Sequence, residues 1–178
     1  MNLEYINGVI RQFEYYKNLG DKTFNQLSDN DFFWKYNDYS NSIAIIINHL
    51  AGNMLSRWTD FLNTDGEKEW RNRDNEFNDI ITDKTALINR WNEGWNCLLS
   101  TLKSLKESDL NKVIYIRNEA HTITEAINRQ LAHYPYHIGQ IVFIGKMLTN
   151  NSWQSLSIPK GSSKEYNDKK FSIKKSIK

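Results

Sequence analysis

Residues 122–141 read TITEAINRQLAHYPYHIGQI, and this stretch decides how the chain folds. Thr122 and Glu125 stand three residues apart, which is the spacing of a capping box at the start of a helix. Beyond this cap, apolar residues recur every three to four positions, namely Ile127, Leu131, Ile138, Ile141 and Leu148. This periodicity predicts one long amphipathic helix from residue 123 to about residue 148.

Three earlier segments have the same helical periodicity. Their apolar stripes are Leu3, Ile6, Ile10 and Phe13 in the first, Ile43, Ile47, Leu50, Met54 and Phe61 in the second, and Leu87, Trp91, Trp95, Leu98, Leu102 and Leu105 in the third. We expect the first helix to continue to about Leu27, and Ser40, Asn41 and Ser42 are candidate N-caps of the second. Four long helices in 178 residues predict an all-α fold, a four-helix bundle.

The connections between these helices differ in length and character. Residues 64–77 form a polar stretch that is longer than a simple bundle turn requires, and connections of this length are often functional. Residues 113–117 read VIYIR and have the β-branched and aromatic character of a short strand or hairpin arm. We expect one domain over residues 1–163, followed by a basic, flexible tail at 164–178.

The composition narrows the class of protein. The net charge of +2 gives no reason to expect a nucleic-acid partner, and seven lysines of residues 160–178 account for much of the excess. A single cysteine, Cys97, excludes an internal disulfide and a cysteine-rich zinc site. The first residues lack the basic and apolar regions of a secretory signal, and no apolar run approaches membrane-spanning length. We therefore expect a soluble, cytoplasmic protein without a membrane partner.

Two of the four histidines stand at His133 and His137, four residues apart on the predicted last helix. Residues at this spacing project from the same helix face, so the two imidazoles can converge on one cation. The face also carries Ile123, Ala126 and Ile141, which indicates that the pair points into the bundle. Pro135 lies between the two histidines and is expected to kink the helix there.

His49 is the third candidate metal ligand. It lies at the margin of the apolar stripe of the second helix, beside the small or polar residues Gly52, Asn53 and Ser56. A single inward histidine is more often a hydrogen-bonded core residue than a ligand. The inward pair together with His49 instead favours a three-histidine metal site. His121 precedes the predicted helix cap and is interpreted as a loop residue.

Other polar side chains near the histidines are candidates for binding substrate or orienting the ligands. Asn53 and Arg57 lie near His49 on the helical wheel, and Arg57 could bind a substrate carboxylate or pair with a surface acid, Asp60 or Glu14. Gln130 and Gln140 flank the histidine pair by one turn and could hydrogen-bond the imidazoles. Arg71 and Arg73 in the long connection have the same two interpretations, with structural roles slightly favoured.

The histidine pattern resembles that of the DinB-like superfamily, which has one histidine on the second helix and an HxxxHxxQ motif, here His133 to Gln140, on the last. Residues 48–74 (NHLAGNMLSRWTDFLNTDGEKEWRNRD) and 156–161 (LSIPKG) are similar to one branch of that superfamily, known only as a domain of unknown function. The resemblance covers about residues 1–165, and Pro135 is the departure from the pattern.

This resemblance implies an up-down-down-up bundle, often a homodimer, with a zinc or nickel ion on His49, His133 and His137 and water in the open positions. It also implies an activity, because some relatives are transferases of a low-molecular-weight thiol such as bacillithiol or mycothiol. Our first hypothesis is therefore a metal-dependent enzyme acting on a small molecule, either a thiol S-transferase or a metal-assisted hydrolase. The alternatives are a metal-binding bundle without catalysis and, on the basic tail alone, a nucleic-acid-associated stress protein.

Overall fold

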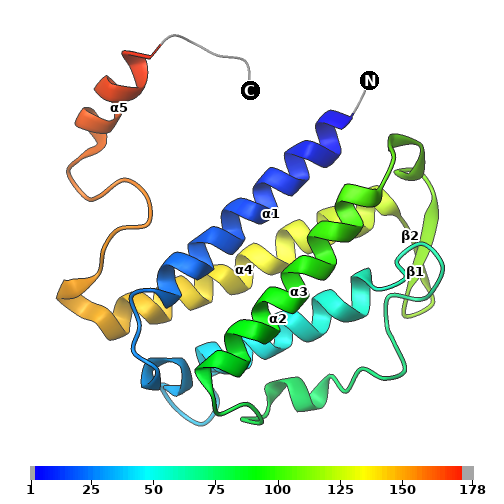
Figure 1. The fold of residues 1–178 in the computed structure, drawn as a ribbon, viewed down its shortest axis with the longest axis horizontal. Coiled ribbons are helices and arrows are strands. Elements are labelled where there is room, and N and C mark those ends of the chain that lie inside the picture. Colours follow the sequence, from blue (N-terminus) through cyan, green and yellow to red (C-terminus); the bar gives the residue numbers. More distant parts are fainter. Residues whose placement is uncertain (1–2, 174–178) are drawn as a thin grey trace.

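The computed structural model describes residues 3–173, and four long helices form its main body (Figure 1). These helices are α1 (Leu3–Phe24), α2 (Ile43–Trp58), α3 (Lys84–Ser104) and α4 (Ile123–Thr149). The predicted caps are confirmed, since Ser42 accepts a hydrogen bond from the Ile45 amide and Thr122 and Glu125 form a capping box. Helix α1 ends earlier than predicted because the amides of Gln26 and Leu27 bond three residues back, which turns the chain and leads Leu27 into the core.

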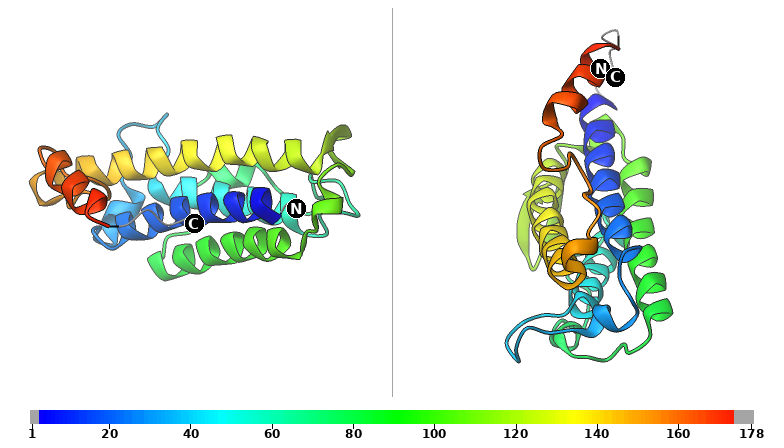
Figure 2. Two further views of the ribbon diagram at one scale, coloured as in Figure 1. Left: turned by 90° about the horizontal axis from the view of Figure 1, so that it is seen from above. Right: turned by 90° about the vertical axis from the view of Figure 1, so that its left-hand side faces the viewer.

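The helices run up-down-down-up, and the predicted four-helix bundle is confirmed (Figures 1 and 2). Helix α1 packs mainly on α4, and α2 packs mainly on α3. Because α2 and α3 are parallel, the connection between them returns along the whole bundle. Within this connection lies the short 3-10 helix η2 (Asp74–Phe77), which packs against α2. The topology thus explains why residues 59–83 form such a long link.

Large aromatic side chains fill the centre of the bundle. Trp58, Trp91, Trp95 and Tyr134 are almost completely buried, and the Trp58 indole N–H donates to the Tyr134 hydroxyl at 3.0 Å. Helices α2 and α3 approach closely at Gly94, where an added Cβ would lie 2.8 Å from the Ala51 Cα. Among residues 3–173, no helix combines the length and the apolar character that crossing a bilayer requires.

A β-hairpin covers one end of the bundle, as the sequence of residues 113–117 suggests. Strand β1 (Val113–Ile116) pairs antiparallel with β2 (Glu119–Thr122), and both turn residues, Arg117 and Asn118, have positive φ. The Asp65 carboxylate accepts both turn amides at 2.8 Å. Burial alone would raise the pKa of Asp65, but these backbone N–H groups hold it below its ordinary value. Asp65 therefore fastens the α2–α3 connection to the hairpin.

Residues Ser163–Phe171 form an exposed helix, α5, set apart from the bundle in Figure 1, and the expected flexibility of the tail at 164–178 stays a prediction. No side chain of α5 is buried, and residues 174–178 of the predicted tail lie outside the described residues. We expect deletion of everything after Ser163 to lower the melting temperature by less than about 2 °C, because removing exposed residues removes little buried apolar surface. Thermal unfolding of the two chains by circular dichroism tests this, and a loss of many degrees would make the tail part of the domain.

Candidate metal centre

Helices α2 and α4 bring three histidines together. The His133 Nε2 lies 3.4 Å from the His49 Nε2 and 3.2 Å from the His137 Nε2. One ligand atom from each ring lies within 4.8 Å of the others. Helix α4 continues without a break through Pro135, so His133 and His137 remain one turn apart on the same face.

The outer nitrogen of each imidazole contacts an oxygen atom. The Nδ1 atoms of His49, His133 and His137 lie 2.9 Å from Glu76 Oε2, 3.3 Å from Gln130 Oε1 and 2.7 Å from Gln140 Oε1, respectively. A carboxylate or amide oxygen accepts hydrogen bonds and cannot donate, so each Nδ1 must carry the proton. The three Nε2 atoms then carry lone pairs that face one another, and this arrangement suits a shared cation.

Glu76 orients His49 from the far side of the ring. Its carboxylate packs directly against α2 at Gly52, where an added Cβ would lie 2.3 Å from Glu76 Oε1. Arg71 binds both carboxylate oxygens, with Nε 2.7 Å from Oε1 and an Nη 2.9 Å from Oε2. Burial alone would raise the pKa of Glu76, but the hydrogen bonds from His49 and Arg71 lower it. An ionised carboxylate on the outer nitrogen is a common support of histidine metal ligands.

The geometry of the three rings and the lowered pKa values of His133 and His137 fit a divalent metal ion. Burial, reinforced by the neighbouring His137 and His49, lowers the pKa of His133 to about 3. Burial also lowers the pKa of His137, against an opposing hydrogen bond with Gln140. Nitrogen ligands about 2.0–2.1 Å from a tetrahedral zinc ion lie about 3.3 Å apart, close to the separations found here. No fourth His, Cys, Asp or Glu among the described residues joins the group.

The lowered pKa values predict how metal binding depends on pH. At pH 6.5 three ordinary imidazoles would together carry about 1.5 protons, which a metal would have to displace. His133 is neutral there because its pKa is about 3, and the lowered pKa of His137 shifts that ring toward its neutral form. We therefore expect binding at pH 6.5 to release clearly fewer protons per chain than these 1.5 or so. Calorimetry of zinc binding in two buffers of different ionisation enthalpy counts the protons, and release of about 1.5 would contradict the prediction.

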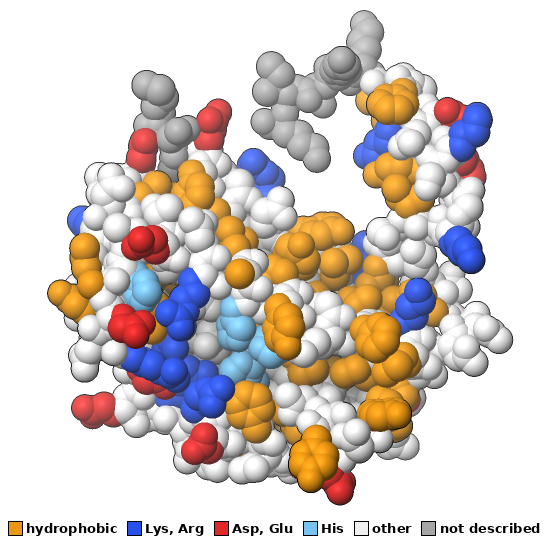
Figure 3. All heavy atoms as spheres, turned by 180° about the vertical axis from the view of Figure 1, so that it is seen from behind, with side chains coloured by type: hydrophobic (Ala, Val, Ile, Leu, Met, Phe, Trp, Pro, Cys, Tyr) orange, Lys and Arg blue, Asp and Glu red, His pale blue; other side chains and the backbone are white. Residues whose placement is uncertain are grey.

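A cavity of about 350 Å³ opens beside the histidines. Its lining includes Asn53, Phe77 and five arginines, which are Arg57, Arg71, Arg73, Arg117 and Arg129. Figure 3 shows this basic surface next to the histidines. Asn53 accepts a hydrogen bond from the Tyr134 hydroxyl at 3.0 Å, and Arg57 is buried and pairs with Glu67 at 3.0 Å, so neither Asp60 nor Glu14 is its partner. Both predicted substrate-binding residues therefore line the cavity, and their role stays a prediction.

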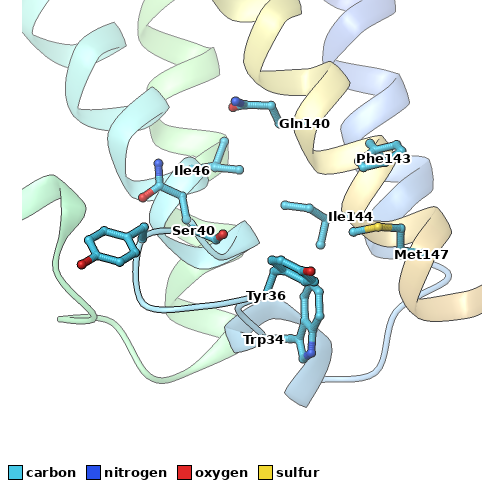
Figure 4. A pocket seen from close by; sticks show the side chains of 10 residues that line it. Trp34, Tyr36, Ser40, Ile46, Gln140, Phe143, Ile144 and Met147 are labelled. Carbon is cyan, nitrogen blue, oxygen red and sulfur yellow. The ribbon is translucent and has the colours of Figure 1, made fainter.

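An apolar pocket of about 520 Å³ adjoins the centre on its other side. Trp34 and Tyr36 face Phe143 and Met147 of α4 across it, and Gln140 stands at its inner end (Figure 4). Gln140 also contacts the outer nitrogen of His137, so this side chain separates the pocket from the centre and borders both. The histidines thus lie between a cationic cavity and an apolar pocket, and Figure 3 shows both surfaces.

Sequence reasoning missed Glu76 and Arg129 as residues of this site. Arg129 precedes His133 by one helical turn, and this i, i+4 spacing is a signal that was available in the sequence. The only local sign of Glu76 is Gly52 near His49, which leaves space that a distant side chain fills. His121 lies in β2, half-buried and 3.9 Å from Glu119, and is not part of the cluster.

Comparison with known proteins supplies the family. A family model described as "Protein of unknown function (DUF1572)" matches residues 1–162, which is most of the chain. Searches of the curated proteins and of the solved structures gave no match. The helical bundle and the three-histidine cluster agree with the resemblance found in the sequence. The chain therefore belongs to the DUF1572 family of proteins of unknown function, a DinB-like family.

Proposed function

We propose that this protein is a metal-dependent transferase that joins a low-molecular-weight thiol to an electrophilic small molecule. The observation that carries the proposal is the cluster of three Nε2 atoms beside an open cavity, in which the His133 Nε2 lies 3.4 Å from that of His49 and 3.2 Å from that of His137. His49, His133 and His137 would hold a zinc or nickel ion. Such an ion supplies Lewis acidity that keeps a coordinated thiol or water deprotonated at neutral pH.

The supporting residues would keep the three ligands in place during turnover. Glu76, Gln130 and Gln140 each hold one imidazole by its outer nitrogen, which fixes both the tautomer and the ring orientation. Removal of such partners from metal sites typically weakens metal affinity or activity about 10- to 100-fold. The protein thus supplies a preorganised set of nitrogen donors rather than one that assembles around the ion.

An open position and two substrate surfaces favour catalysis over a metal-binding module without activity. A purely structural zinc site normally has four protein ligands, whereas three histidines form the cluster among the described residues. The cationic cavity would receive a thiol that carries negative charge, and the apolar pocket near Gln140 would receive the acceptor. A pocket of this size and apolar lining suits a drug-sized molecule.

The transfer can be written with a simple acceptor, 1-chloro-2,4-dinitrobenzene. The thiol loses its S–H proton to solvent, the new S–C bond forms at the ring carbon, the C–Cl bond breaks, and chloride leaves with the bonding electron pair. No oxidant or reductant is required. The residues of the chain would bind and align the two reactants. Such alignment lowers the entropic part of the activation barrier.

The test is a transfer assay with zinc- and nickel-loaded protein. A panel of thiols, including bacillithiol, mycothiol and cysteine, would be combined with 1-chloro-2,4-dinitrobenzene, and the thioether followed by absorbance. We expect one of the thiols to react faster with the loaded protein than with the metal-free protein or with the His137→Ala variant. Equal rates with all thiols and both metals would refute the transferase and leave the metal-binding module without catalysis.

A further inference from the structure

Positive charge is concentrated in the cavity beside the three histidines. The whole chain is nearly balanced, with 23 lysines and arginines against 21 aspartates and glutamates. The cavity, in contrast, is lined by five arginines, and the carboxylates that contact them belong to Glu67 and Glu76. Five guanidinium groups against these two carboxylates and the nearby Asp65, which interacts electrostatically with Arg57, leave an excess of positive charge that a bound anion would offset.

Three of these arginines are engaged in holding the structure. The guanidinium of Arg57 binds the Gly66 carbonyl and the Glu67 carboxylate, and burial lowers its pKa. Arg71 binds Glu76 through two hydrogen bonds, and Arg117 contacts Glu67 at 3.1 Å. Their charges contribute to the field of the cavity, and each already has a carboxylate partner, although the buried Nε of Arg57 has no hydrogen-bond partner among the described residues.

Arg73 and Arg129 are the two that remain available. Neither forms an ion pair with any carboxylate of residues 3–173, and both side chains are exposed. The Arg73 guanidinium lies 5.1 Å from the centre of the Phe77 ring, and that ring stacks on His49 with 4.7 Å between centroids. The Phe77 ring therefore holds Arg73 beside the metal centre.

Arg129 reaches the same cavity from the other helix. It precedes His133 by four residues on α4, so the two side chains lie on one helix face. Both guanidinium groups thus line the cavity, Arg73 against Phe77, which contacts His49, and Arg129 one helical turn from His133. A planar guanidinium offers paired N–H donors that match the oxygens of a carboxylate or a phosphate.

We propose that Arg73 and Arg129 bind an oxyanion group, a carboxylate or a phosphate, of the small molecule that reaches the three-histidine centre. The assignment of that molecule as the substrate rests on the proposed function, whereas binding of the anion itself requires no metal. The excess charge is best matched by a molecule with two or more negative charges. The sequence predicted Arg57 to bind the substrate. In this scheme Arg57 instead positions the loop at Gly66 and Glu67 and does not contact the anion.

The experiment measures binding of succinate and of inorganic phosphate to the metal-free protein by isothermal titration calorimetry. The variants are Arg73→Gln, Arg129→Gln and the double variant, and the matched control is Arg11→Gln, which removes the same charge from an exposed position on α1 outside the cavity. We expect at least one anion to bind, each single variant to weaken it about threefold, and the double variant to weaken it about tenfold or more. The control should change affinity less than twofold.

The outcomes separate this inference from the proposed function. Tighter binding of succinate supports a carboxylate ligand, and tighter binding of phosphate supports a phosphorylated one. The inference is overturned if neither anion binds, or if Arg11→Gln weakens anion binding as much as the cavity variants do. Either result would count even if the loaded protein transfers a thiol. Conversely, anion binding that depends on both arginines supports the inference even if every transfer assay fails, in which case only the proposed function is lost.

Discussion

Replacing His137 by Ala is expected to weaken zinc binding by about 100-fold or more. Structural zinc sites have apparent binding free energies of roughly 10–16 kcal/mol, which is about 3 kcal/mol for each of four ligands. Loss of one imidazole leaves His49 and His133, two nitrogen donors that lie 3.4 Å apart. The bundle should stay folded, because His137 is only partly buried and its removal leaves the aromatic core intact.

Competition with a chromophoric chelator at pH 7.5 measures this loss, and the metal content of purified protein gives the stoichiometry. His121→Ala is the matched control, since His121 lies outside the cluster. We expect about one zinc per chain in the control and no stoichiometric zinc in the variant. Full occupancy in His137→Ala with unchanged affinity would show that other residues hold the ion.

Replacing Glu76 by Gln is expected to have the second-largest effect, on both metal affinity and stability. An amide cannot hold the His49 proton as an ionised carboxylate does, so zinc affinity should fall about 10- to 100-fold. The side chain of Arg71, only 2% exposed, loses the nearer of its two carboxylate partners and keeps Glu67 at 3.3 Å. A buried charge left unpaired typically costs 3–5 kcal/mol, and since Glu67 and the new amide oxygen still accept hydrogen bonds from Arg71 we expect about 3 kcal/mol or less.

Glu67→Gln separates these two effects. Glu67 pairs with Arg57, Arg71 and Arg117 but contacts none of the three histidines. We expect this control to lose stability in urea unfolding while the zinc affinity of the folded protein is unchanged. If Glu76→Gln also kept the zinc affinity of the wild type, the carboxylate would have only a structural role, and the metal centre would not depend on it.

Local patterns were sufficient to predict the helices. The apolar spacing of residues 87–105 and the capping box at Thr122 depend only on neighbours along the chain, and both are found in the structure. The predicted end of the first helix was less accurate, because the hydrogen bonds that turn the chain at Gln26 and Leu27 coincide with packing of Leu27 into the core. The lysine-rich tail at 164–178 was expected to be flexible; its first part is helical without burying a side chain, and its flexibility stays a prediction.

The metal centre was predictable only where its residues share a helix. His133, His137 and their partners Gln130 and Gln140 all lie on α4, and the 3.6-residue repeat alone brings them to one face. The placement of His49 opposite them needed the assumption that the second and last helices face each other. The structure supplies that contact, with the His49 ring 5.0 Å from the His137 ring between centroids.

By itself the sequence determined the four helices, their caps and the pair of histidines, because each depends on interactions over a few residues. The tertiary structure alone decided which distant side chains complete the site. Glu76 reaches His49 across 27 residues only because the parallel α2 and α3 force the connection back along the bundle, and Gly52 leaves room for its carboxylate. Arg117 joins the cavity because Asp65 fixes the hairpin turn. Such contacts depend on how separate elements pack, and no periodicity along the chain encodes that packing.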